Sequence, residues 1–154
     1  MLHKVILISA MSLIFVGCAS VPMSNQTLSD AAKKFNPPAE GKSGIYTYRD
    51  STIGGALKKD ILIDGKCVGE SAPKVFFFTE VDGDKNHTIS TESEFSPNSI
   101  NIFTKSGINY FVRQYIKMGA FVGGANLEQF DAEQGKQEVS KLKLAKQGNC
   151  SSTR

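Results

Sequence analysis

The chain is poor in the residues on which most recognisable active sites depend. Its 154 residues include no tryptophan, two histidines and three cysteines, and its arginines are Arg49, Arg113 and Arg154 alone. Nucleic-acid-binding proteins usually carry an arginine-rich basic stripe, so we expect no nucleic-acid partner. A closed zinc site takes four ligands, usually Cys and His. If residues 1–17 are removed and Cys18 is lipidated, as expected below, only Cys67, Cys150 and His87 remain, which are too few. We therefore expect no metal ion and no cofactor.

No apolar run is long enough to cross a membrane. The longest, residues 5–16, has only two interruptions, both serines, but a spanning helix needs roughly 20 residues. Lys4 precedes this run, and the small residues Gly17, Cys18 and Ala19 follow it. A basic head, a short apolar core and small residues make up a secretory signal, so we expect residues 1–17 to be removed.

The end of this segment shows how the mature chain would be held. Phe15-Val16-Gly17-Cys18 resembles a bacterial lipobox, and the resemblance implies that Cys18 is lipidated and becomes the first residue. The alternative is an ordinary secretory signal with a chance cysteine near the cut. Stable anchoring takes more than one acyl chain, and the three chains that lipoprotein processing implies meet that condition. In Gram-negative lipoproteins, Asp after the cysteine favours the inner membrane; Ala19 implies the outer membrane, facing the periplasm.

The other two cysteines, Cys67 and Cys150, form an even pair. Disulfides persist in oxidising compartments such as the periplasm, so we expect a bridge between them. It would tie the C-terminal end of the domain to its first half. The alternative is two separate thiols.

Residues 18–43 contain few large apolar side chains, and Pro37-Pro38 stiffen the chain near the end of this segment. This composition predicts a flexible tether that holds the domain off the membrane. Within it, residues 29–35 have the pattern of one or two helical turns, with Ser29 as the cap. The folded domain is then expected over residues 44–150.

Short β-type runs separated by turn residues fill most of this domain. Asp64-Gly65 between two apolar runs predicts a tight hairpin, and the run 74–81 is apolar on both faces, as in a covered central strand. Asp131 and Gln134 resemble a capping box for a helix over 131–146, although Leu142 and Leu144 also fit a short terminal strand. The predicted strands are 45–49, 60–63, 66–69, 74–81, 87–92, 99–104, 110–118 and 120–127. The prediction is a mostly β chain: a single β-sandwich domain with a C-terminal helix, preceded by a signal peptide and a flexible tether.

Two family resemblances agree with this fold. Residues 63–69 and 81–89, with an Asp-Gly-Lys hairpin and a later Gly shortly before His87, resemble the PEGA-type pattern of envelope β-sandwiches. Over residues 44–146 the chain resembles bacterial lipoproteins of the uncharacterised DUF2846 domain family. The likeness rests on Tyr48-Arg49-Asp50, Ile63-Asp64-Gly65-Lys66 and Tyr110-Phe111-Val112-Arg113-Gln114. It implies fold and location and adds no catalytic residue.

Few side chains remain as candidates for chemistry. His87 is the only histidine after residue 17, so a Ser-His-acid system would need it, but its place beside a turn favours a packing role. Arg49 and Arg113 each lie in an aromatic strand, with Tyr115 beside the second. If the strands are neighbours, these residues could bind a carboxylate, phosphate or sugar acid; the alternative is pairing with the protein's own acids.

We therefore expect no enzyme and no catalytic residue. The predicted function is a lipid-anchored envelope lipoprotein, attached to the membrane through Cys18, with a non-catalytic β-sandwich that serves as a binding or structural module of unknown ligand. The candidate partners are an envelope protein and a glycan. The alternative is an envelope enzyme that acts on glycan or lipid.

Overall fold

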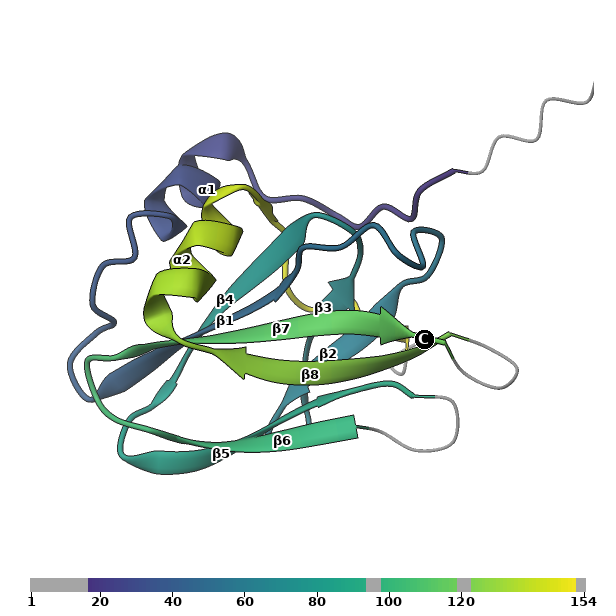
Figure 1. Ribbon diagram of the computed structural model, residues 1–154. Coiled ribbons are helices and arrows are strands. Elements are labelled where there is room, and N and C mark those ends of the chain that lie inside the picture. The colour runs from purple at the N-terminus through teal and green to yellow at the C-terminus, as the bar shows by residue number, and fades with distance from the viewer. Residues whose placement is uncertain (1–16, 94–97, 119–122, 152–154) are drawn as a thin grey trace, which may run out of the picture.

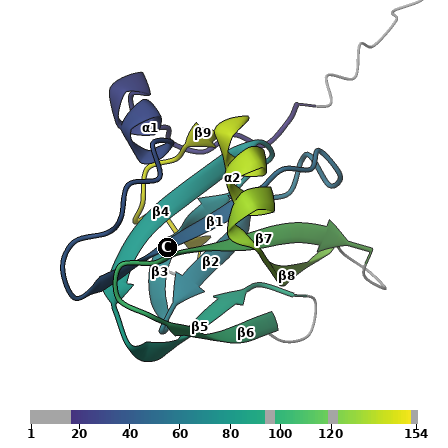
Figure 2. The ribbon, with the colours of Figure 1, turned by 60° about the vertical axis from the view of Figure 1, so that its left-hand side comes forward.

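Two β-sheets stack face to face, and two helices cover the outer face of the larger sheet (Figures 1 and 2). This computed structural model describes residues 17–93, 98–118 and 123–151. Its elements are α1 (Gln26–Ala32), β1 (Lys42–Arg49), β2 (Lys59–Ile63), β3 (Lys66–Ser71), β4 (Val75–Asp82), β5 (Lys85–Thr91), β6 (Asn98–Thr104), β7 (Asn109–Lys117), β8 (Gly124–Phe130), α2 (Ala132–Ser140) and β9 (Lys143–Leu144). The predicted mostly β fold, with a helix near the C-terminus, is confirmed.

The larger sheet has the strand order β8-β7-β1-β4-β9, and the smaller one the order β3-β2-β5-β6. Most neighbours are antiparallel, but β1 runs parallel to β7 and β4 runs parallel to β9. After β1 the chain forms β2 and β3 of the smaller sheet, returns to the larger sheet as β4 on one side of β1, forms β5 and β6 of the smaller sheet, and then pairs as β7 on the other side of β1. As a result, the C-terminal ends of β1 and β7 lie at the same end of the sandwich.

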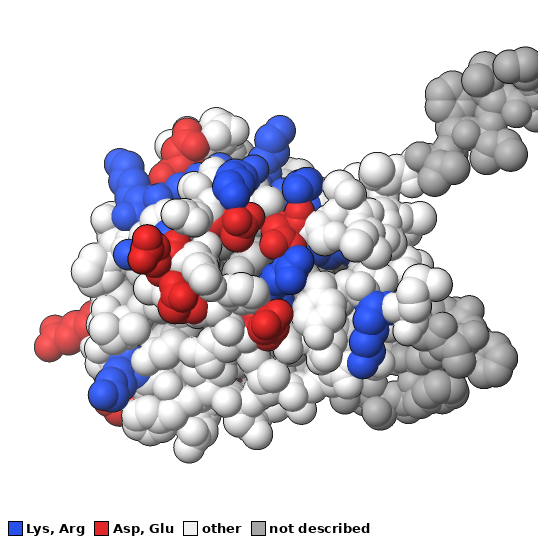
Figure 3. All heavy atoms as spheres, viewed as in Figure 1, with Lys and Arg blue, Asp and Glu red and all other residues white. Residues whose placement is uncertain are grey.

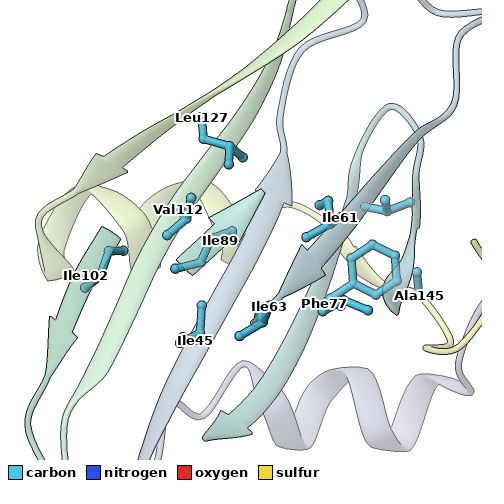
Figure 4. Close-up of a cluster of buried hydrophobic side chains, with 11 residues drawn as sticks. Ile45, Ile61, Ile63, Phe77, Ile89, Ile102, Val112, Leu127 and Ala145 are labelled. Atoms are coloured by element: carbon cyan, nitrogen blue, oxygen red, sulfur yellow. The ribbon is translucent and has the colours of Figure 1, made fainter. Parts of the chain in front are cut away.

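The main core lies between the two sheets (Figure 4). Ile45 and Val112 project into it from the larger sheet, and Ile61, Ile63 and Ile89 meet them from the smaller one. All five are at most 3% exposed. These side chains occupy alternate strand positions, because successive residues of a strand point to opposite faces.

A second, aromatic core fills the space between the larger sheet and the helices. Tyr46, Phe76 and Phe111 are at most 1% exposed, and the rings of Tyr46 and Phe111 stack with centroids 5.0 Å apart. Phe35, just after α1, packs on Tyr46 at 5.4 Å. Strand β4 is thus covered on both faces, as its sequence predicted.

The structure also confirms the predicted Asp64-Gly65 turn and the predicted Asp131 cap. Asp64 and Gly65 both have positive φ, 51° and 74°, as a type I′ hairpin turn requires. The Asp131 side chain accepts a hydrogen bond from the Gln134 amide at 2.9 Å and caps α2. The helix ends at Ser140, earlier than predicted, and the alternative reading of a short strand near Leu144 is correct.

The structure corrects the prediction that all of residues 18–43 form a flexible tether. Helix α1 begins after Asn25, whose side chain caps it, and Ser29 lies inside the helix instead of capping it. Ser29 is buried, and its hydroxyl accepts a hydrogen bond from the Leu144 amide at 3.2 Å. Buried polar and apolar contacts therefore hold much of this segment against the domain, which leaves less free tether than its composition suggested.

Some predictions fall on residues that the structure does not describe. They are the signal segment up to Val16, with the lipobox residues Phe15 and Val16, and the start of the strand predicted over 120–127. Within the described ranges, no helix is long and apolar enough to cross a bilayer.

Candidate functional site

The cysteine proposed for lipidation lies on the surface of the domain. Of the three cysteines, all within the described residues, Cys18 alone is unpaired, and it is exposed. The next residue is already fixed, because the Ala19 amide donates to the Gly55 carbonyl at 2.7 Å. Further along, the Ser24 amide donates to the Leu144 carbonyl at 3.0 Å. Lipid on Cys18 would therefore begin at the edge of the folded domain.

The predicted disulfide between Cys67 and Cys150 is present. The two sulfurs are 2.00 Å apart, the Cα atoms are 6.0 Å apart, and 83 positions separate the residues in sequence. Backbone hydrogen bonds run beside the bridge: the Gly148 amide donates to Val68 at 2.9 Å, and the Glu70 amide donates to Asn149 at 2.7 Å. The C-terminal segment thus closes the β3 edge of the smaller sheet.

The two candidate arginines do not form a common site. Strands β1 and β7 are neighbours, as the hypothesis required, but Tyr48 is the residue opposite Arg113. Arg49, one residue on, points to the opposite face of the sheet. Its guanidinium is fully buried and donates to the carbonyls of Ile53, Gly54 and Leu57 at 2.7–3.0 Å. Arg49 therefore orders the segment 50–58 and offers no group to a ligand.

Arg113 and Tyr115 remain near a polar pocket. Arg113 pairs with Asp50 at 2.9 Å, and its guanidinium lies 5.7 Å from the centre of the Tyr115 ring. Burial lowers the pKa of Arg113 while Asp50 raises it, and the net change is upward. A cavity of about 380 Å³ opens beside this pair, lined by Tyr48, Asp50, Arg113, Phe130, Gln134, Gln137 and Glu138. Arg113 therefore pairs with an acidic residue of the protein itself, as the alternative prediction stated, and the pair lies at the rim of the pocket.

One feature of this pocket was not predicted from the sequence. Tyr48 is 1% exposed, and its hydroxyl has no hydrogen-bond partner among the described residues. Burial raises the pKa of Tyr48, and Asp50 raises it further, so the hydroxyl stays protonated. A buried hydroxyl without a partner is costly. Within the described part of the chain, the Tyr48 hydroxyl therefore lies unpaired beneath the pocket, and the polar groups at the pocket rim are those of Asp50 and Arg113.

His87 lies in a second cleft and is already engaged on both sides. Its Nδ1 is 2.6 Å from Asp64 Oδ2, and its Nε2 is 2.8 Å from the Asp82 carbonyl oxygen. Burial would raise the pKa of Asp64, but hydrogen bonds from His87 and Thr88 lower it overall. The surrounding cavity measures about 400 Å³ and includes Lys42 and Asp82, which form a surface ion pair. Because both ring nitrogens face acceptors within the protein, His87 acts as a turn-packing residue, as its position suggested.

Among the described side chains, no three or more His, Cys, Asp or Glu residues gather as metal ligands. Arg113 pairs with Asp50 in one cavity; in the other, His87 pairs with Asp64, and Asp82 pairs with both Lys42 and Lys85.

Comparison with known proteins confirms the predicted resemblance to the DUF2846 family. Residues 39–125 match the family described as "Protein of unknown function (DUF2846)". A relative described as "Uncharacterized protein", from Haemophilus influenzae (strain ATCC 51907 / DSM 11121 / KW20 / Rd), is 55% identical over 138 residues, which cover 90% of this chain and 82% of the relative. No solved structure matches.

Proposed function

We propose that this chain, which belongs to the DUF2846 family, is a lipid-anchored lipoprotein of the bacterial cell envelope with a non-catalytic binding module. The observation that carries the proposal is the division of its cysteines. Cys67 and Cys150 are joined, whereas Cys18 is exposed where the chain meets the domain. A disulfide fits an oxidising compartment, and a single free cysteine after a secretory signal fits lipidation.

The location follows from the same segment. Ala19 after the lipidated cysteine favours the outer membrane by the sorting rule of Gram-negative lipoproteins, and we propose its periplasmic face. The close relative comes from a Gram-negative bacterium, for which this rule is meaningful.

The proposal that the module is non-catalytic rests on the hydrogen bonds that its titratable groups make. His87 contacts Asp64 and the Asp82 carbonyl through both nitrogens, which leaves no lone pair aimed at the cavity. A general base needs such a lone pair within hydrogen-bond reach of the substrate. The Arg113 pocket instead offers the donors and acceptors of Arg113, Asp50 and the two glutamines of α2, which suit the recognition of a glycan or of a polar segment of an envelope protein.

The first experiment is the intact mass of the protein extracted from membranes, with a Cys18→Ser variant as control. We expect a chain that lacks residues 1–17 and carries acyl chains, with two thiols that alkylate only after reduction. The control should carry no lipid and retain the two masked thiols. An unlipidated wild-type chain would refute the anchor.

The second experiment tests the binding site. The mature domain and an Arg113→Gln variant are compared for binding to isolated cell wall and for crosslinking to envelope proteins. We expect retention of the native domain and a clear loss in the variant, with His87→Ala folded and still binding. A native domain that binds neither would refute the binding module.

A further inference from the structure

We propose that one end of the β-sandwich rests directly on an anionic phospholipid bilayer, so that the protein lies against the membrane in a fixed orientation. The inference rests on the proposed lipidation of Cys18. This surface, here called the anchor end, comprises Cys18, Ile53, Met118 and a groove beside residues 19–23. Three independent features of the structure support it: the short connection to the anchor, the exposed apolar side chains and the lysines of the groove.

The first feature is the short connection between the lipidated residue and the folded domain. The Ala19 amide donates to the Gly55 carbonyl at 2.7 Å, and the Lys146 amide donates to Pro22 at 2.8 Å. One extended residue spans only about 3.5 Å. With its thiol carrying acyl chains, Cys18 therefore brings the segment around Gly55 into the headgroup region.

The second feature is a pair of apolar side chains at that end. Ile53 is 66% exposed and Met118 is 91% exposed, although nothing in the described structure covers them. Ile53 is held in place, because Arg49 donates to its carbonyl and the next residue, Gly54, lies against the Ile116 side chain near the end of β7. Met118 directly follows the last residue of that strand. Apolar side chains on an ordered surface beside a lipid anchor suit the boundary between headgroups and acyl chains.

The third feature is the groove next to Cys18. It measures about 320 Å³ and is lined by Ala19, Ser20, Val21, Met23, Ala72, Pro73, Lys74, Val75, Lys141 and Lys143. Six of its lining residues are apolar, and its three charged residues are all lysines. Lys141 pairs with Glu138 at 2.8 Å, and the Lys74 ammonium donates to the Asp50 carbonyl, so these two lysines are held at the groove by the protein itself. Lysine ammonium groups above an apolar surface match the phosphates and upper acyl chains of anionic phospholipids. Around the stem of the N-terminal segment, the face in Figure 3 shows mostly uncharged atoms.

The opposite end supplies a matched control. Ile108 is 48% exposed and precedes β7, and the nearby Gly107 amide donates to Lys42 at the start of β1. Ile53 follows the other end of this eight-residue strand. At about 3.3 Å per residue, the length of β1 separates the two positions by roughly 23 Å. A bilayer that touches Ile53 therefore leaves Ile108 in water.

Because the sequence contains no tryptophan, a tryptophan introduced at one position is the only source of tryptophan fluorescence in that variant. Single variants Ile53→Trp, Met118→Trp and Ile108→Trp of the full, lipidated protein are reconstituted in phosphatidylethanolamine–phosphatidylglycerol vesicles, with and without brominated acyl chains. All three sites are exposed, so the fold should tolerate the change, and circular dichroism checks it. We expect a blue shift and loss of more than half of the fluorescence at positions 53 and 118, and neither effect at 108.

The outcomes separate the two proposals. Intact mass is measured on the same samples, so an unlipidated chain refutes the anchor. A lipidated protein whose three tryptophans are all unquenched, or equally quenched, refutes the anchor end and leaves the anchor standing. Equal quenching of the position 53 and 118 reporters in purely phosphatidylcholine vesicles would refute the preference for anionic lipid.

Discussion

The bridge between Cys67 and Cys150 gives the most exact prediction for stability. It closes a loop of 83 positions, and in the chain-entropy account a loop of this length contributes about 4.5 kcal/mol by restricting the unfolded chain. For a domain of this size, 1 kcal/mol moves the melting temperature by about 3–4 °C, so loss of the bridge should lower it by roughly 15 °C.

The assay is thermal unfolding of the mature domain, followed by circular dichroism with and without reductant. The thiol of Cys18 is removed by Cys18→Ser, so that it cannot exchange with the bridge. A Cys67→Ala, Cys150→Ala double variant should melt near the reduced protein and be insensitive to reductant. A reduced protein that melts within a few degrees of the oxidised one would refute the reasoning.

The same perturbation has a local signature. The Glu70 amide donates to Asn149, and the Gly148 amide donates to Val68, only while the C-terminal segment lies along β3. Without the bridge, this edge is held by hydrogen bonds, such as those of Ser151 with Asp60 and Glu92, and should open more often. Hydrogen exchange should therefore rise at Glu70 and Gly148 in the reduced protein, while the amides of β1 keep their protection.

Three further predictions concern single side chains. Arg49→Met removes the donor to three carbonyls, and we expect urea unfolding to show a loss of about 3 kcal/mol; a loss below about 1 kcal/mol would contradict the buried role. Gly135→Ala adds about 1 kcal/mol by helix propensity, but its Cβ would overlap the Phe111 ring, so we expect a lower melting temperature, and a rise would be evidence against this packing. The pKa of Asp64 is lowered in the folded protein despite burial, because His87 and a backbone amide donate to its carboxylate. The ionised carboxylate therefore stabilises the fold above the ordinary pKa of Asp, and this contribution is lost as the pH falls. Melting curves from about pH 5 to pH 2 should fall less for Asp64→Asn than for the native protein, and parallel curves would speak against the pair.

Local patterns of the sequence predicted much of this fold because their causes are local. Asp64-Gly65 predicts its turn because both residues tolerate positive φ, which the structure confirms. The run around Phe76 and Phe77 predicts a covered strand because alternate positions are apolar on both faces. Asp131 predicts the start of α2 because its carboxylate reaches a free amide three residues on.

The features that the sequence did not reveal depend on distant parts of the chain. Composition alone marked residues 18–43 as a tether, but Ser29 and Phe35 gain their partners from β9 and β1. Arg49 and Arg113 lie in neighbouring strands, yet the parallel register of β1 and β7 sets them on opposite faces. The Tyr48 hydroxyl is isolated by α2, which packs over the sheet from far along the chain.

The proposed orientation also decides which sites a partner can reach. Asp82 lies opposite Lys42 at the start of β1, whereas Ile53 follows the end of the same strand. The His87 cleft is therefore at the end away from the bilayer, and the Arg113 pocket opens on the flank between β7 and α2. In the proposed orientation, a glycan or protein partner on the periplasmic side would reach the Arg113 pocket without crossing the lipid surface. Crosslinkers placed at Gln137, which lines the Arg113 pocket, should consequently capture partners that crosslinkers at Ile53 do not, and the reverse result would place the binding site at the membrane.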